Sequence, residues 1–367
     1  MDARVRVVPI SEERPSPGKP LCSRGKKEAK VLNVGVIGFG YWGPNLARNF
    51  NQSNDTHLAM IADFSASRLA LAKRIYAGVR TVVDPYELIR ARDVDAVAVA
   101  VPVRFHYELA KAALEAGKHV WLEKPMADSA ARCEELIELA ERANRVLLVD
   151  HTFLYTGAVR KMKSVIDAGE LGDIWYFDSV RINLGLFQHD VNVVWDLAPH
   201  DLSIMHFLLN RTPKSLTAVG AAHTGNGIED MAYLNLDFGD NLVANIHVNW
   251  LAPVKIRHTI VGGSRKMLVY NDLEAVEKIR IYDTGINIGH DDLEDRRRTL
   301  IQYRTGDMLA PLVPNTEALA TEAAHFAECV AENKRPISDG KAGWNVVRIL
   351  EACEQSLKAG GQRVTLA

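Results

Sequence analysis

The sequence has few cysteines, no long hydrophobic run and almost no net charge, and each shortage excludes a class of protein. The cysteines form no C-x-x-C pair, which argues against a disulfide framework or a zinc site; they are Cys22, Cys133, Cys329 and Cys353. No apolar run reaches the roughly 18 residues that a membrane helix needs. Lys and Arg total 44 against 46 Asp and Glu, so the surface is not built for nucleic acid or anionic lipid. We therefore expect a cytoplasmic protein that binds neither nucleic acid nor membrane and, since its histidines lack metal-ligand spacing, no metal.

The chain of 367 residues is long enough for about two domains. Residues 1–29 contain four prolines and no apolar stretch of the roughly 7–15 residues that a secretory signal needs. We predict a flexible tail over residues 1–29, a first domain over 30–150 and a second domain over 151–367.

Short apolar runs alternate with helical patterns through the first domain. The runs lie at 31–37, 58–62, 81–83, 94–101, 119–122 and 146–149. They do not alternate with polar residues, which is typical of parallel strands covered by helices on both faces. The pattern predicts an α/β fold with a doubly wound parallel sheet.

The second domain changes to a period of two. Apolar and polar residues alternate over 232–238 and again over 242–250, with Gly239-Asp240 as the predicted hairpin turn. We expect a mostly antiparallel sheet with one buried face, the other being solvated or covered by a second subunit. Helical patterns near 155–168, 317–333 and 341–359 complete an α+β domain.

A glycine-rich turn follows the first run and opens a helix. It reads G-x-G-x-x-G and consists of Gly38, Phe39, Gly40, Tyr41, Trp42 and Gly43. The first glycine allows the tight turn, the second lets the backbone approach a pyrophosphate, and the third lets helix and strand pack closely. The helix N-terminus then offers N–H groups and a positive dipole end to phosphates. The alternative is that these glycines serve only the turn; strand, helix and a following acid favour a dinucleotide site.

Asp63 ends the second run, twenty positions after Gly43. A carboxylate there accepts hydrogen bonds from the adenosine ribose and repels a 2′-phosphate. The sequence therefore predicts NAD as the cofactor, with NADP less favoured. The alternative role for Asp63 is to cap the following helix.

Two further motifs carry candidate catalytic groups. Glu123-Lys124-Pro125 follows the fifth run, at the sheet edge where open α/β sheets bind ligands. A Lys there stabilises developing negative charge on a substrate oxygen, although an ordinary strand exit has the same appearance. Asp196 and His200 stand one turn apart if their helix begins by Asp196, and such an acid orients the ring and favours its protonated form. The alternative is a capping Asp beside an incidental His.

Together, these motifs resemble the glucose–fructose oxidoreductase, inositol dehydrogenase and rhizopine-catabolism (Gfo/Idh/MocA) oxidoreductases. The resemblance rests on the Gly38–Gly43 turn, on 116–120 leading into Glu123-Lys124-Pro125, and on the Asp196 to Asp201 segment. It implies a Rossmann domain, then an open-faced sheet that forms a homodimer or homotetramer. It further implies Lys124 and His200 as the acid/base pair, with Asp196 supporting His200. The residues it implies for the cofactor groove are Pro102, His106, Glu123 and Lys124.

Within the family, residues 41–46 and 192–201 look most like members that act on sugars and nucleotide sugars, such as UDP-N-acetylglucosamine 3-dehydrogenases. Residues 151–155 depart from the Arg-Phe pair that many members carry after the sixth strand. The residues expected to contact a sugar substrate are Arg181, Asn183 and His189. Three alternatives use similar parts: an inositol or cyclitol dehydrogenase, a sugar ketoreductase, and a sensor that binds dinucleotide without catalysis.

Overall fold

The computed structural model describes residues 31–185, 187–188, 191–225, 227–289 and 300–366. The tail predicted at 1–29 and the substrate candidate His189 lie outside these ranges. Among the described residues, no helix combines the length and apolar character needed to cross a membrane.

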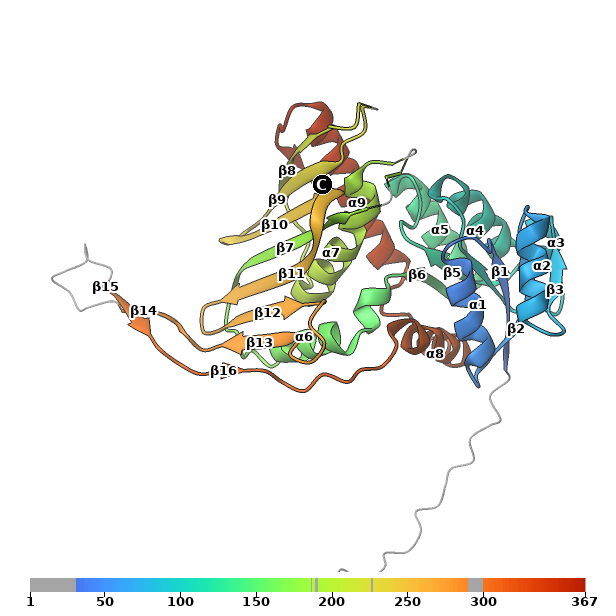
Figure 1. The fold of residues 1–367 in the computed structure, drawn as a ribbon, viewed down its shortest axis with the longest axis horizontal. Coiled ribbons are helices and arrows are strands. Elements are labelled where there is room, and N and C mark those ends of the chain that lie inside the picture. The colour runs from blue at the N-terminus through green and yellow to red at the C-terminus, as the bar shows by residue number, and fades with distance from the viewer. Residues whose placement is uncertain (1–30, 186, 189–190, 226, 290–299, 367) are drawn as a thin grey trace, which may run out of the picture. The chain divides into compact units, whose positions relative to one another are not determined.

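The first sheet is parallel and has six strands in the order β3-β2-β1-β4-β5-β6 (Figure 1). Its strands are β1 (Leu32–Ile37), β2 (Thr56–Ala62), β3 (Arg80–Val82), β4 (Ala96–Val99), β5 (His119–Glu123) and β6 (Leu147–Asp150). The intervening helices are α1 (Gly43–Gln52), α2 (Ala66–Ile75), α3 (Pro85–Arg90), α4 (His106–Glu115) and α5 (Ala130–Ala143). Every residue of β4 is buried, which explains its uninterrupted apolar sequence. The predicted doubly wound α/β fold is confirmed.

The second sheet has nine strands in the order β16-β13-β12-β11-β7-β10-β9-β8-β17 (Figure 1). Its strands are β7 (Ile174–Leu184), β8 (Ser215–Ala221), β9 (Met231–Gly239), β10 (Leu242–Asn249), β11 (Leu251–Gly263), β12 (Met267–Asn271), β13 (Ile279–Tyr282), β16 (Met308–Leu309) and β17 (Val364–Thr365). Only the β7–β10 pair is parallel among the pairings of this sheet in the described residues. A separate two-stranded ribbon joins β14 (Gly285–Gly289) to β15 (Leu300–Arg304). The mostly antiparallel sheet is confirmed.

The hairpin between β9 and β10 turns one residue later than expected. Gly239 pairs with Leu242, so the two turn residues are Asp240 and Asn241. Their φ angles are 53° and 59°, the left-handed values that a tight hairpin turn uses and that Asp and Asn tolerate. Gly239 ends the strand instead of starting the turn.

Helices of the second half join the two sheets. Helix α6 (Gly157–Asp167) packs on α7 (Val193–Leu209), and α7 lies on β7 and β10. Helix α9 (Gly340–Lys358) contacts β8 on one side and α5 and β6 on the other. The core therefore runs without interruption between the two sheets.

Helix α8 (Ala318–Glu332) returns to the first sheet, which differs from a division at residue 150. It packs against α1, and the ring of Phe326 lies edge-on to Trp121 of β5, with centroids 5.6 Å apart. Large apolar residues at this helix thus complete the core of the first domain. The chain enters the second domain and comes back, which a linear reading of the sequence did not predict.

Candidate active site

The glycine turn between β1 and α1 is sterically tight. Gly38 has φ +93°, and a Cβ on it would lie 2.2 Å from the carbonyl oxygen of Ala100. A Cβ on Gly43 would lie 1.9 Å from the carbonyl oxygen of Gly38. A Cβ on Gly40 would make only ordinary contact, 3.5 Å from the Arg68 guanidinium. The turn therefore needs glycine at two positions for its own geometry, whereas Gly40 leaves the backbone open to a ligand.

Asp63 is held in place by backbone amides. Its Oδ2 accepts a 2.7 Å hydrogen bond from the amide of Phe39, and its Oδ1 accepts a 2.8 Å bond from the amide of Ser65. The guanidinium of Arg68 lies 3.6 Å from Oδ2. The carboxylate is thereby fixed at the carboxyl end of β2, the position predicted for a ribose contact.

A cavity of about 750 Å³ extends over this turn and over the end of β4. Predicted cofactor residues that line it are Gly38, Gly40, Tyr41, Trp42, Asp63 and Pro102. Exposed aromatic side chains, among them Phe64 and Tyr86, border the same cavity. A largely apolar cavity with one fixed carboxylate and a helix N-terminus fits the adenosine and pyrophosphate of a dinucleotide.

Two residues predicted to contact the cofactor, Phe39 and His106, have buried side chains. The side chain of Phe39 is buried and stacks edge-on with Tyr76, so this residue offers its backbone and not its ring. His106 is also buried, with Nδ1 2.8 Å from the carbonyl oxygen of Pro125 and Nε2 2.8 Å from that of Val101. His106 therefore joins the loop after β4 to the turn after β5.

Glu123 lies in a buried group of carboxyls beside the catalytic candidates. Burial raises its pKa, and the nearby carboxylate of Asp150 raises it further, so both favour the protonated form of Glu123. Asp150 in turn accepts a 3.1 Å hydrogen bond from Trp42 Nε1 and a 2.5 Å bond from Thr152 Oγ1. The ends of β5 and β6 are thus connected to the glycine turn through the indole of Trp42.

Lys124 projects from the end of β5 to helix α7. Its Nζ donates a 2.9 Å hydrogen bond to the backbone oxygen of Asp196 and lies 3.6 Å from the Oδ1 of the same residue. The helix begins at Val193, where the Asn192 side chain caps it by accepting bonds from two backbone amides. Because it begins before Asp196, Asp196 and His200 do stand one turn apart.

The predicted support of His200 by Asp196 is absent from the described structure. Asp196 Oδ2 accepts a 3.0 Å hydrogen bond from Trp250 Nε1, and its other oxygen is directed to Lys124. The Nδ1 of His200 is buried and has no hydrogen-bond partner among the residues that the structure describes. Asp196 therefore positions Lys124, because the indole fixes its carboxylate away from the imidazole.

The pKa of His200 is lowered well below the ordinary value of 6.5. Burial is the largest cause, and the cations of Lys124, Arg181 and Arg257 add to it. The sequence predicted an acid that favours the cationic ring, so this expectation was wrong. A neutral imidazole at pH 7 is suited to accept a proton from an alcohol.

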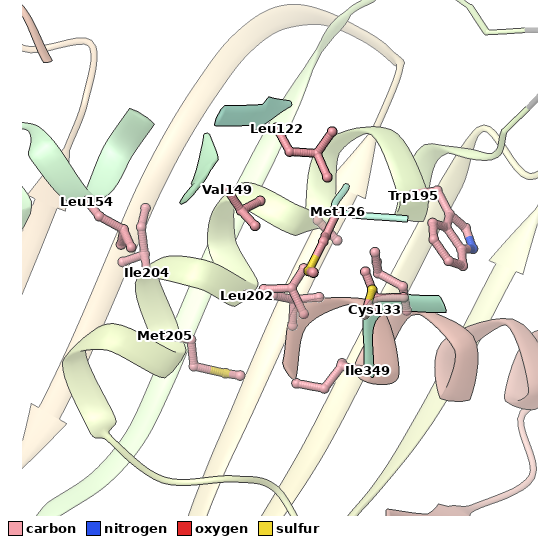
Figure 2. Packing of buried hydrophobic residues seen from close by; sticks show 14 of the residues in the cluster. Leu122, Met126, Cys133, Val149, Leu154, Trp195, Leu202, Ile204, Met205 and Ile349 are labelled. Atoms are coloured by element: carbon pink, nitrogen blue, oxygen red, sulfur yellow. The ribbon is translucent and has the colours of Figure 1, made fainter. Parts of the chain in front are cut away.

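The catalytic helix is anchored by the core shared between the domains. In Figure 2, Leu202 of α7 lies near Met126 and Val149, and Ile204 of α7 lies near Leu154; Leu122 belongs to the same buried cluster. Lys124 follows Leu122 by two positions, and His200 precedes Leu202 by two. Close packing of these neighbours fixes the positions of both catalytic candidates.

The predicted substrate residues lie on β7, the central strand of the second sheet. Arg181 is buried and forms an ion pair with Asp201, with Nε 2.6 Å from Oδ2. Asn183 follows two positions later, on the same face of the strand and half-buried.

Three side chains at the site were not predicted: Phe153, Trp250 and Arg257. Phe153 packs edge-on against His200, with ring centroids 5.1 Å apart. The guanidinium of Arg257 lies 5.6 Å from the same ring. Arg257 lies on β11, and Trp250 lies in the turn before it. The local sequence around an arginine or a tryptophan does not indicate which distant residue it contacts.

Comparisons with known proteins place both halves of the chain in one family. The model "Oxidoreductase family, NAD-binding Rossmann fold" of the Gfo/Idh/MocA family matches residues 32–151, and the family's C-terminal domain model matches 159–269. The 2,7-anhydro-N-acetylneuraminate hydratase of Mediterraneibacter gnavus is 27% identical over 89% of this chain and 96% of its own. The inositol 2-dehydrogenase of Salmonella paratyphi B is 28% identical over 70% of this chain and 79% of its own.

Solved structures include proteins with a similar fold. A UDP-N-acetylglucosamine 3-dehydrogenase from Acidithiobacillus ferrooxidans has a TM-score of 0.75 and 23% identity, covering 90% of this chain and 99% of that chain. The resemblance inferred from the glycine turn, the Lys124 motif and the His200 helix is thereby confirmed. The chain belongs to the Gfo/Idh/MocA family of NAD-dependent oxidoreductases.

Proposed function

We propose that the protein interconverts a secondary hydroxyl and a ketone on a sugar or nucleotide-sugar ring, as a UDP-N-acetylglucosamine-type 3-dehydrogenase would. One observation carries this proposal: Lys124 Nζ, from the first domain, lies 2.9 Å from the backbone oxygen of Asp196, one turn before His200 on the second domain's helix. An ammonium and a neutral imidazole held together at the end of a Rossmann sheet are suited to alcohol oxidation.

NAD is the cofactor favoured by the cavity. Gly40 leaves room for the pyrophosphate, and the Asp63 carboxylate is oriented to accept bonds from the adenosine ribose hydroxyls. The same negative charge disfavours a 2′-phosphate, although Arg68 at 3.6 Å partly offsets it. When bound, the nicotinamide supplies the hydride acceptor.

The chain's own residues supply the proton chemistry. His200 takes the hydroxyl proton at Nε2, because its Nδ1 is the buried nitrogen. Lys124 donates a hydrogen bond to the same oxygen and stabilises the negative charge that develops there. Asp196, fixed by Trp250, keeps the ammonium in position. In the opposite direction the imidazolium returns the proton to the ketone oxygen.

An inositol or cyclitol dehydrogenase is the second candidate, favoured by the 28% identity to the Salmonella enzyme. It requires the same acid/base pair and differs only in the ring that is bound. A sugar ketoreductase is the same reaction in reverse. A dinucleotide sensor is disfavoured because Lys124, Asp196 and His200 are all retained.

The outer face of the second sheet supports a homodimer or homotetramer. Val219, Tyr233 and Val243 are 50%, 39% and 53% exposed on neighbouring strands of this face. Apolar side chains gathered on one sheet face are typical of an interface. Light scattering of the purified protein measures its mass, and a V243E variant should shift that mass toward the monomer.

Activity is tested with purified protein, NAD and a panel of sugars, nucleotide sugars and cyclitols, with NADH absorbance as the readout. We expect at least one ring alcohol to reduce NAD, and the activity to be lost in K124M and H200N. A K111M variant, which changes an exposed lysine of α4, serves as the matched control. Turnover that survives both active-site substitutions would contradict the assignment.

A further inference from the structure

The substrate side of the site contains two arginines that the proposed reaction does not use. Arg181 on β7 and Arg257 on β11 are direct partners in the register of these antiparallel strands. Their guanidinium carbons lie 4.6 Å and 5.6 Å from the ring centroid of Phe153. His200 packs on that ring too, with centroids 5.1 Å apart. Two cations are therefore gathered around the aromatic ring that the catalytic imidazole contacts.

Like charges at directly opposed positions of a sheet destabilise it unless they are offset. Arg181 is offset by Asp201, at 2.6 Å and 3.2 Å, and Arg257 by Asp272, at 2.9 Å. The hydroxyl of Tyr270 donates a hydrogen bond to the other oxygen of Asp272. Each arginine thus has one structural carboxylate and is held in a defined orientation.

These carboxylates do not use all of the guanidinium donors. Among the described residues, Arg181 Nη1 and Arg257 Nε are buried without a hydrogen-bond partner. A buried guanidinium N–H without an acceptor is unfavourable, because the group has lost its hydrogen bonds to water. Arg181 is nearly inaccessible, whereas 29% of the Arg257 side chain is exposed. Arg257 is consequently the arginine that a ligand reaches, and Arg181 adds its charge from behind.

In the described part of the chain, the imidazole beside them has no anionic partner. Nδ1 of His200 is buried and unbonded, and the side chains that act on its charge most strongly are Lys124, Arg181 and Arg257. The carboxylate of Asp196, one turn away, is bound to Trp250 and Lys124. A negative charge that entered beside Arg257 would be stabilised by several cations at once.

We propose that Arg257, backed by Arg181, binds a carboxylate carried by the substrate, so that the enzyme prefers sugar acids to neutral sugars. This inference rests on the proposed dehydrogenase function and narrows its substrate class. A guanidinium matches a planar carboxylate in geometry and charge. Arg257 already gives Nη1 to Asp272 and its Nε is buried, so the part of the guanidinium that a ligand can reach suits one carboxylate better than a phosphate dianion.

The test compares matched pairs of ligands that differ only in the acid group. Binding to the NADH-loaded protein is measured by calorimetry for methyl glucoside and methyl glucuronide, galactose and galacturonate, UDP-glucose and UDP-glucuronate, and N-acetylneuraminate and its methyl ester. Glucose 6-phosphate is added as a phosphate probe. Turnover with NAD is measured for the same compounds.

We expect at least one acid to bind at least about 10-fold more tightly than its neutral counterpart, the worth of one charged hydrogen bond. R257Q should abolish that difference, and R257K should restore part of it. K255Q removes an exposed charge two positions away on the same strand and should leave it unchanged. The ratio of the two affinities in a pair distinguishes ligand recognition from a general loss of structure. A loss of structure would weaken the binding of the acid and of its neutral counterpart alike.

Equal affinities within every pair, or a preference that R257Q leaves intact, would overturn the subsite. Tight binding of glucose 6-phosphate alone would overturn the carboxylate assignment. If no compound reduces NAD but an acid still binds through Arg257, the reaction assignment fails while the subsite stands. If neutral sugars are oxidised as well as acids, the reaction stands and the subsite fails.

Discussion

The cofactor side and the substrate side of the site are built in different ways. The cofactor side consists of the Gly38–Gly43 turn and Asp63, which come from one short β-α-β segment. Its geometry follows from backbone sterics, such as the 1.9 Å separation that a Cβ on Gly43 would have from the Gly38 oxygen. The proposed substrate side consists of Phe153, Arg181, Trp250 and Arg257. These residues come from segments far apart in the sequence and meet only in the assembled fold.

This difference determines which side of the site tolerates amino-acid substitutions. Backbone geometry tolerates few substitutions, so the cofactor side needs particular residue types at particular spacings. Side chains on a sheet face can be exchanged while the strands remain paired. Each substitution below tests one of the two sides.

The largest effect should come from G43A on the cofactor side. The added methyl would overlap the Gly38 carbonyl, which must move, and overpacking against backbone costs about 3 kcal/mol. We expect a lower free energy of unfolding in urea together with lost NADH binding. G40A is the matched control: its methyl meets only the end of Arg68, so stability should be retained and cofactor affinity alone should fall.

D63N should change the cofactor preference by a smaller factor. Removing the charge weakens bonds to the ribose hydroxyls by about 1.5 kcal/mol and releases Arg68 to meet a 2′-phosphate. We expect KM for NAD to rise roughly 10-fold and the NADP-to-NAD ratio of kcat/KM to increase. D93N removes an exposed carboxylate of the same domain and should leave both values unchanged. An unaltered ratio in D63N would restrict Asp63 to a structural role.

The pH profile tests the state of His200. Its pKa in the folded protein lies well below 6.5 because of burial and neighbouring cations, so the ring stays neutral as the pH falls through 6.5. Since alcohol oxidation needs the neutral ring, kcat/KM should stay level there and decline only at lower pH. Below pH 6.5 the unfolded chain takes up a proton on this ring while the folded protein does not, so stability decreases from about pH 6.5 down to the folded pKa, the range in which kcat/KM is still level. A midpoint of the pH profile at or above 6.5 would contradict the lowered pKa of His200.

The smallest effect should come from W250F, which removes the indole donor to Asp196 and keeps an aromatic ring. Asp196 then orients Lys124 less firmly, and kcat should fall about 3–10-fold, the worth of one hydrogen bond. KM for NAD should not change, because the indole lies on the substrate side. A change in KM for NAD without a change in kcat would contradict the inference that Trp250 acts on Lys124 through Asp196.

The cofactor side was predictable from sequence because it depends on local spacing. The strand before Gly38, the helix after Gly43 and the acid at Asp63 determine one another over a short stretch of chain. The positions of Lys124 and His200 in the fold also follow from recognisable motifs, since Lys124 directly follows β5 and His200 lies within α7, while their catalytic roles stay a prediction.

The partners of these residues were not predictable. The spacing along α7 predicted that Asp196 would contact His200, but the Trp250 indole, from the turn between β10 and β11, binds its carboxylate instead. The sequence around Arg257 does not indicate a ligand site, because the proposed role of Arg257 depends on Arg181, its partner on the neighbouring strand. Tertiary contacts of this kind decide which of several local hydrogen bonds forms, and they also set the neutral state of the imidazole.

Convergence of Lys124 and His200 on one alcohol oxygen is tested most directly by a double-mutant cycle. Turnover of the same substrate is measured for K124M, H200N and the double variant, with NADH binding to each as the check on folding. Because the two groups act on one oxygen, each single substitution should reduce kcat about 10²–10⁴-fold, and the double should be little worse than the worse single. Independent, multiplying losses, or full turnover in either single variant, would contradict the account.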